Sequence, residues 1–362
     1  MEITRLEKAL RPYLDGATGS RYNVSDVMSL VQPGEHCGHI YRKMDASRAE
    51  IEQAIVNTVS YVDTFDYPLT TAEIHRYLIK LPLSSGKLQE SLNKSTLIPH
   101  RLQRVGKYYM LPGREAIAAV REERRVRAER LWPEAVYYGR LIAQMPFVRM
   151  VAVTGSLAVN NVGPQEDIDY FIVTANDRLW VCRAFVILIV RWAARRAVML
   201  CPNYFLAERA LRIQTRNLYT AHEITQMLPL FGLPVYHTLR RLNPWTHRFL
   251  PNACDAPVIP GYVKDALEEP LPATNNHFLE HLLNTPVGRR IDQLEMSRKI
   301  RRFQHVYPGS QEAEFSPNYC KGHFNHHQQR TIQAYEQLVG DMSDEREHPE
   351  MPVKEPAKQV PV

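Results

Sequence analysis

Two aspartates stand at the start of an apolar run in the middle of this chain. Residues 151–174 are VAVTGSLAVNNVGPQEDIDYFIVT, so Asp167 and Asp169 flank Ile168 and lead directly into the run. Side chains alternate between the two faces of a β-strand, so both carboxylates should project to one side and Ile168 to the other. A divalent cation bound by both groups resolves their mutual repulsion. The alternative is a solvated acidic turn, since Asp is common in turns.

A Gly-Ser turn precedes this pair and could supply the complementary half of a site. Gly155 follows an apolar run and has no Cβ, so a polyphosphate can approach its backbone closely. Ser156 is expected to open a short helix, where free N–H groups favour an anion and the hydroxyl adds a donor. The two halves together predict a place for a nucleoside triphosphate (NTP) with Mg²⁺, with one ion or two about 3.5–4 Å apart.

The sequence TGS, followed after ten further residues by DID inside a strand, resembles the signature of the nucleotidyltransferase fold, the superfamily of DNA polymerase beta. The resemblance covers roughly residues 147–206. It implies that Gly155 and Ser156 hold the triphosphate and that Asp167 and Asp169 bind the metal ions.

The same family pattern has a third carboxylate on a later strand, which serves as metal ligand and general base. The matching segment here, residues 198–208, has Asn203 in its interior and Glu208 just beyond it. Either Glu208 takes the catalytic role or the third acid is missing.

The residues around this centre predict an α/β core, because apolar strand-like runs alternate with helical patterns. Strands are expected at 147–155, 167–174 and 198–206, and helices at 156–162 and 178–197. A long charged helix, interrupted near Pro133, is expected before them over 116–145. After them, 217–232 is expected to form one amphipathic helix that packs on the core, with Tyr219 or Glu223 as alternatives for facing an acceptor.

The segment 46–115 predicts three helices closed by a hairpin, an arrangement that resembles a winged helix. Thr70 and Glu73 have the spacing of a capping box, and the hairpin should turn at Val105–Gly106–Lys107. The hairpin is basic, with tyrosines expected at its tip. It carries Arg101, Arg104, Lys107, Arg114, Tyr108 and Tyr109. Contact with a nucleic-acid backbone and packing between domains are both open interpretations of this surface.

The fold class is therefore an α/β (α+β) nucleotidyltransferase-like core with a winged-helix-like domain before it and a helical region after it. The expected domains are a loosely ordered lead-in, the winged-helix-like domain, the nucleotidyltransferase-like domain, the helical region and a disordered tail. Their boundaries are 1–45, 46–115, 116–235, 236–340 and 341–362.

Composition adds weaker constraints. The net charge of +6 permits an anionic partner without requiring one. The five cysteines include no CxxC pair, which favours reduced thiols and a cytoplasmic location, and the longest apolar segment, 184–190, is too short to cross a membrane. A cluster of Cys320, His323, His326 and His327 either binds a metal or, as the favoured interpretation, begins a polar helix.

The function that these patterns predict is a Mg²⁺-dependent nucleotidyltransferase. It would move a nucleotidyl group from an NTP to an acceptor hydroxyl and release pyrophosphate. The alternative is a nucleotide-sensing regulator without turnover, which binds nucleic acid through residues 46–115.

Overall fold

The fold is known here from a computed structural model, and all statements below concern the residues that it describes. These residues are 46–94, 97–164, 167–257, 276–306, 314–321 and 327–344, with Gly261 and Lys264. They belong to one compact unit of the chain, which is mixed α/β and contains two sheets. The predicted lead-in lies outside the described residues, as does the tail beyond Asp344. Residues 341–344, which were expected in that tail, end helix α15.

The segment 46–115 forms helices and a small antiparallel sheet, in agreement with the helices and hairpin expected there. The helices are α3 (Arg48–Asp63), α4 (Thr71–Arg76), α5 (Ser85–Lys94) and the short α6 (Leu97–His100). The strands are β1 (Leu69–Thr70), β2 (Gln103–Val105) and β3 (Tyr108–Met110), in the order β1-β3-β2. The predicted capping box is confirmed, because Thr70 accepts from the Glu73 backbone N–H while the Glu73 carboxylate accepts from the Thr70 N–H.

Helix α7 (Ile117–Ala143) is continuous and contains Pro133, so the interruption expected there is wrong. Much of its charge is neutralised along its own surface. Arg125 pairs with Glu129, and Arg127 with Glu123, four residues apart in each case. Its other face packs on the large sheet, where the buried Tyr170 hydroxyl donates to the Ala135 carbonyl at 2.6 Å.

The large sheet has six strands in the order β7-β4-β5-β6-β9-β8. They are β4 (Val148–Val153), β5 (Ile168–Thr174), β6 (Leu200–Ala207), β7 (Leu228–Phe231), β8 (Glu314–Phe315) and β9 (Tyr319–Lys321). Strands β5 and β6 are parallel, and every other neighbouring pair is antiparallel. The three strands expected from the sequence are confirmed as β4, β5 and β6.

The other three strands correct two predictions. The segment 217–232 is helical only in α10 (Leu218–Gln226), and its apolar end continues as edge strand β7. The region 236–340, which was expected to be helical, contains β8 and β9 as well as helices. Both misses are short strands, whose stability comes from pairing with a distant strand and not from local propensity.

Side chains on the two faces of the large sheet enter different cores. Met150, Ala152, Phe171 and Val173 pack in a cluster that includes α10 and the 46–111 segment. Val151, Val153, Ile168 and Tyr170 enter a second cluster with α7 and α9 (Leu179–Ala194). This alternation follows from the two-residue period of a strand. Because of this alternation, the side chain of Asp169 lies on the same face as Phe171 and Val173.

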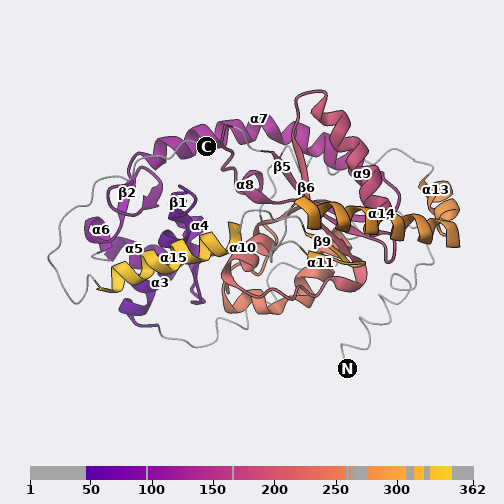
Figure 1. Cartoon of the computed structure of the whole chain (residues 1–362). Helices are drawn as coiled ribbons and strands as arrows, with labels where there is room; N and C mark the ends of the chain where they lie inside the picture. Colours follow the sequence, from indigo (N-terminus) through magenta and orange to yellow (C-terminus); the bar gives the residue numbers. More distant parts are fainter. Residues whose placement is uncertain are drawn as a thin grey trace. The chain divides into compact units, whose positions relative to one another are not determined.

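Some of the remaining helices lie around this sheet, and α15 lies beside α3 (Figure 1). The remaining helices are α8 (Gly155–Ala158), α11 (Leu233–Leu242), α13 (Asn276–Leu283), α14 (Pro286–Val306) and α15 (His327–Asp344), with the 3₁₀ turns η1 (Glu208–Ala210) and η2 (Pro244–Arg248). Helix α14 packs on α9, and α15 on α3. Asp292 of α14 caps α9 by accepting from the Trp180 and Val181 N–H groups.

Two whole-chain expectations are also tested. Among the described residues, no helix is both long and apolar enough to cross a membrane. Cys182, Cys201 and Cys320 are free thiols, but Cys254 takes part in a disulfide. The expectation that all five cysteines are reduced is therefore wrong.

Candidate metal centre

Asp167 and Asp169 lie where β5 begins. Asp167 directly precedes the strand and Asp169 is its second residue, while Ile168 between them is fully buried in the core on the opposite face. Both aspartates are half-buried. The expectation that the two carboxylates share one face, with Ile168 on the other, is confirmed.

Cys201 completes a cluster that the sequence had not revealed. One potential ligand atom from each of Asp167, Asp169 and Cys201 lies within 4.8 Å of the others. The cause is the parallel register, which pairs Asp169 with Cys201. Burial and, to a lesser extent, the two carboxylates raise the pKa of the Cys201 thiol, so it stays protonated near neutral pH unless a metal displaces its proton.

A bulge in β6 brings Asn203 to the same centre. Asp169 pairs with Cys201 but Phe171 with Tyr204, so β6 has one extra residue at this point. The Asn203 side-chain amide donates to Asp169 Oδ1 at 2.8 Å. The interior of this strand therefore offers a neutral amide and a thiol where the family pattern has an acid.

Gly155 fits against Asp169 in a way that no other residue could. Its φ of +64° lies in the left-handed region, and a Cβ built on it would lie 2.1 Å from Asp169 Oδ2. The Thr154 N–H also donates to the Asp169 carbonyl at 3.0 Å. The Gly-Ser turn and the aspartate pair, 12 residues apart from Gly155 to Asp167, are thus adjacent in space. Ser156 follows in the first turn of α8 and is half-buried.

Glu208 does not belong to this centre, and its predicted role as general base there is wrong. It begins η1 after the far end of β6, where Ala207 pairs with Thr174. Thr174 is five residues along β5 from Asp169, about 16 Å at the rise of an extended strand. Burial raises the pKa of Glu208, and Arg149 partly offsets this effect. Glu208 is distant because β5 and β6 run parallel. The aspartates lie at the start of this pair of strands, and Glu208 follows its end.

A narrow crevice opens beside the centre, between α10 and strands β5 and β6. Its walls are formed by Thr154, Phe171, Asn203, Tyr204, Ile213, Thr220, Glu223, Ile224 and Met227. The Phe171 and Tyr204 rings stack with centroids 4.5 Å apart. Glu223 is the one acid among these residues, whereas Tyr219, the other candidate for facing an acceptor, is not among them.

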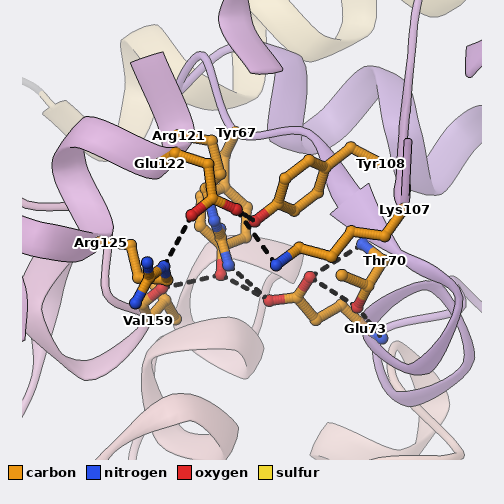
Figure 2. Close-up of polar contacts among 9 residues, drawn as sticks. All are labelled: Tyr67, Thr70, Glu73, Lys107, Tyr108, Arg121, Glu122, Arg125 and Val159. Carbon is orange, nitrogen blue, oxygen red and sulfur yellow. Dashed lines mark hydrogen bonds and ion pairs between the residues drawn. The ribbon is translucent and has the colours of Figure 1, made fainter. Parts of the chain in front are cut away.

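The basic hairpin, for which nucleic-acid contact and packing were both open interpretations, is largely engaged within the protein (Figure 2). Lys107 Nζ lies 3.1 Å from Glu122 of α7, and the Tyr108 hydroxyl donates to the same carboxylate at 2.6 Å. Tyr108 and Tyr109 follow the turn, as expected, but both are buried, so their rings are not presented to a partner. Arg114 pairs with Asp63 and Asp66. These contacts favour packing over nucleic-acid contact.

Behind the hairpin, an ion pair between the buried Arg121 and the half-buried Glu73 joins the 46–115 segment to α7 (Figure 2). Arg121, 6% exposed, donates from Nη2 to Glu73 Oε1 at 2.7 Å and stacks over the Tyr67 ring at 3.5 Å. Burial lowers the pKa of Arg121 to about 9 and raises that of Glu73, whose capping bonds to Thr70 oppose the rise. Both ions thus bear a desolvation cost that their partners offset.

The cysteine–histidine cluster is not assembled as a helix face. Cys320 lies in β9, where it is buried and pairs with Phe205, while His327 begins α15. His323 and His326 lie outside the described residues. The expected polar helix start therefore holds only from His327 onward.

Three comparisons with known proteins give no relative. No family model matches the chain, and neither the curated proteins nor the solved structures contain a significant match.

Proposed function

We propose that the chain is a metal-dependent nucleotidyltransferase that transfers a nucleotidyl group from an NTP to an acceptor hydroxyl. The observation that carries the proposal is the contact of Asp169 with Gly155. It joins a turn with an accessible backbone to a pair of carboxylates, with Cys201 at ligand distance. Triphosphate and metal need these two features side by side.

The donor atoms fit a divalent cation through the two carboxylates, which are the ligands of hard cations such as Mg²⁺. The Cys201 sulfur adds a softer donor that Zn²⁺ accepts more readily than Mg²⁺ does. Asp167 and Asp169 would hold the metal, and Gly155 and Ser156 would contact the phosphates. A bound cation would polarise the α-phosphate and stabilise the charge that develops on it.

Within this proposal, Glu223 takes the role of general base. It lines the crevice together with Thr154 and Asn203, and both of these residues contact Asp169. An acceptor hydroxyl in the crevice gives its proton to the Glu223 carboxylate. The acceptor oxygen then forms a bond to the α-phosphorus, and pyrophosphate leaves with the electron pair of the bond that breaks.

The test is the release of pyrophosphate from labelled NTPs, with Mg²⁺, Mn²⁺ and Zn²⁺ supplied separately. Glycerol serves as a generic acceptor. We expect release by the wild type and none by the double variant Asp167→Asn/Asp169→Asn. Asp177→Asn is the matched control, because Asp177 lies beyond the opposite end of β5, is exposed and pairs with Arg209. Equal release by the double variant and the control would refute the proposal.

A second candidate is the regulator that binds nucleotide without turnover. The observation in its favour is the pairing of Asp169 with Cys201 and Asn203 on β6, where an acid is expected. It predicts NTP binding with no pyrophosphate release under any of the three metals. In this candidate function, the protein binds nucleic acid through residues 46–115, whose helices and hairpin follow one another in the order of a winged helix. This candidate predicts salt-sensitive DNA binding that Arg104→Ala/Lys107→Ala abolishes.

A further inference from the structure

The turn that follows α8 is held from outside the large sheet. The Val159 carbonyl lies 2.8 Å from the Tyr67 hydroxyl. The Asn161 side-chain amide donates to the Phe65 carbonyl at 3.2 Å, and Arg124 of α7 donates from Nη1 to both that carbonyl and Asn161 Oδ1. Val159 and Asn161 are therefore fixed by the loop after α3 and by α7.

Tyr67 is itself locked in place (Figure 2). Its hydroxyl lies 2.9 Å from Glu73 Oε1 as well as 2.8 Å from the Val159 carbonyl, and its ring lies under the Arg121 guanidinium. The hydroxyl has one proton and can donate to only one of these oxygens at a time. Arg121 neutralises Glu73, which allows the carboxylate to remain in this half-buried position.

The held turn is continuous with the residues that would contact phosphate. The backbone N–H groups of Val159 and Asn161 both donate to the Ser156 carbonyl, at 3.3 and 2.8 Å. At its other end α8 begins at Gly155, against Asp169. The four residues of α8 thus lie between two fixed points, the aspartate of β5 and the hydroxyl of Tyr67.

We propose that Tyr67 is a positioning residue of the candidate centre: by holding Val159, it keeps Gly155 and Ser156 in place against Asp169. This inference rests on the proposed function, because it assumes that the Gly155–Ser156 turn contacts a nucleotide. In this inference, the 46–115 segment supports nucleotide binding although none of its residues contacts the metal or the phosphates.

The test compares two Tyr→Phe variants within one network. Tyr67→Phe keeps the ring under Arg121 and removes the contacts of the hydroxyl with both Val159 and Glu73. Tyr108→Phe removes the bond to Glu122 and leaves the α8 turn untouched. Affinity for a nonhydrolysable NTP analogue with Mn²⁺ is measured by calorimetry, and stability by urea denaturation. We expect about three- to tenfold weaker analogue binding for Tyr67→Phe, the equivalent of one hydrogen bond, and unchanged binding for Tyr108→Phe.

Each outcome is decisive. A wild type that binds neither Mn²⁺ nor the analogue overturns the proposed function, and this inference with it. Wild-type binding that Tyr67→Phe leaves intact overturns the inference alone, as does an equal loss in both variants, which would indicate general loosening of the junction. Should Tyr67→Phe not fold, Asn161→Ala breaks the same turn's bonds to Phe65 and Arg124 and should weaken analogue binding similarly.

Discussion

Two groups of carboxylates in this protein are built in opposite ways. At the junction of α4 and α7, Glu73 meets the guanidinium of Arg121 and two bonds from Thr70. At the start of β5, Asp169 meets the neutral amide of Asn203 and lies within ligand distance of a second carboxylate and a thiol. The first group carries its own counter-charge, whereas the second assembles donors that suit a cation from solution.

Helix α10 contacts α3 on one side and lines the crevice on the other. His222 stacks on Tyr61 of α3 with ring centroids 4.4 Å apart, while the adjacent Glu223 lines the crevice beside the aspartates. A carboxylate with its own arginine, such as Glu73, serves the structure. A carboxylate that gathers a second carboxylate, a thiol and an amide around it, such as Asp169, is a candidate for chemistry. Four predictions test this contrast, in order of decreasing effect on stability.

The largest effect is expected at the junction. Arg121→Leu leaves the half-buried Glu73 carboxylate without its cation and should lower the free energy of unfolding by about 2–3 kcal/mol in urea denaturation. The control is Arg125→Leu, whose 38%-exposed side chain pairs with Glu122 and Glu129 on the surface of α7 and should cost at most about 1 kcal/mol. Similar losses in both variants would show that the Arg121–Glu73 pair has no special structural role.

The next effect depends on pH. Burial lowers the pKa of His222 from 6.5 to about 3. Below about pH 6.5 the unfolded chain therefore binds a proton that the folded chain excludes. Stability should fall with decreasing pH by about 1.4 kcal/mol per unit from this group, or about 2 kcal/mol at pH 5. Phe at position 222 keeps a ring against Tyr61, so His222→Phe should remove this slope in urea titrations between pH 7 and pH 5. An unchanged slope would assign it to other groups.

A smaller loss of folding stability is expected from a substitution in the Gly155–Ser156 turn beside the aspartates. Gly155→Ala places a Cβ against Asp169 Oδ2 at a left-handed φ, and should cost about 1–2 kcal/mol and weaken Mn²⁺ binding. Gly106→Ala is the matched control, because Gly106 has a similar φ of +58° with nothing within 4 Å of the added Cβ. It should cost about 1 kcal/mol and leave Mn²⁺ affinity unchanged. Mn²⁺ affinity is read by electron paramagnetic resonance, and normal affinity in Gly155→Ala would contradict the arrangement.

The smallest effect on stability is expected where the acids face each other. Asp167→Asn/Asp169→Asn removes like-charge repulsion, so the metal-free protein should be as stable as the wild type within about 0.5 kcal/mol, or slightly more stable. The rise in melting temperature on adding Mn²⁺ should disappear. A marked loss of stability without metal would show that the two carboxylates are structural, as Glu73 is.

Much of the candidate centre could be predicted from local pattern. The alternation DID placed both acids on one face, the apolar runs placed β4, β5 and β6, and the spacing of Thr70 and Glu73 placed a helix start. These features depend on neighbours within a few residues, whose geometry the backbone repeats fix. Strands β7, β8 and β9 escaped prediction because two to four residues carry no reliable period.

Local pattern is enough to place two carboxylates on one face behind a glycine turn. The residues that surround them depend on how the strands pair and the helices pack. The parallel register of β5 and β6, with a bulge at Asn203, brought Cys201 and Asn203 to Asp169 and sent Glu208 to the far end of the sheet. The packing of the 46–115 segment on the turn after α8 likewise set Tyr67 against Val159, 92 residues away. Register and packing are chosen by the burial of whole faces at once, so no single segment encodes them.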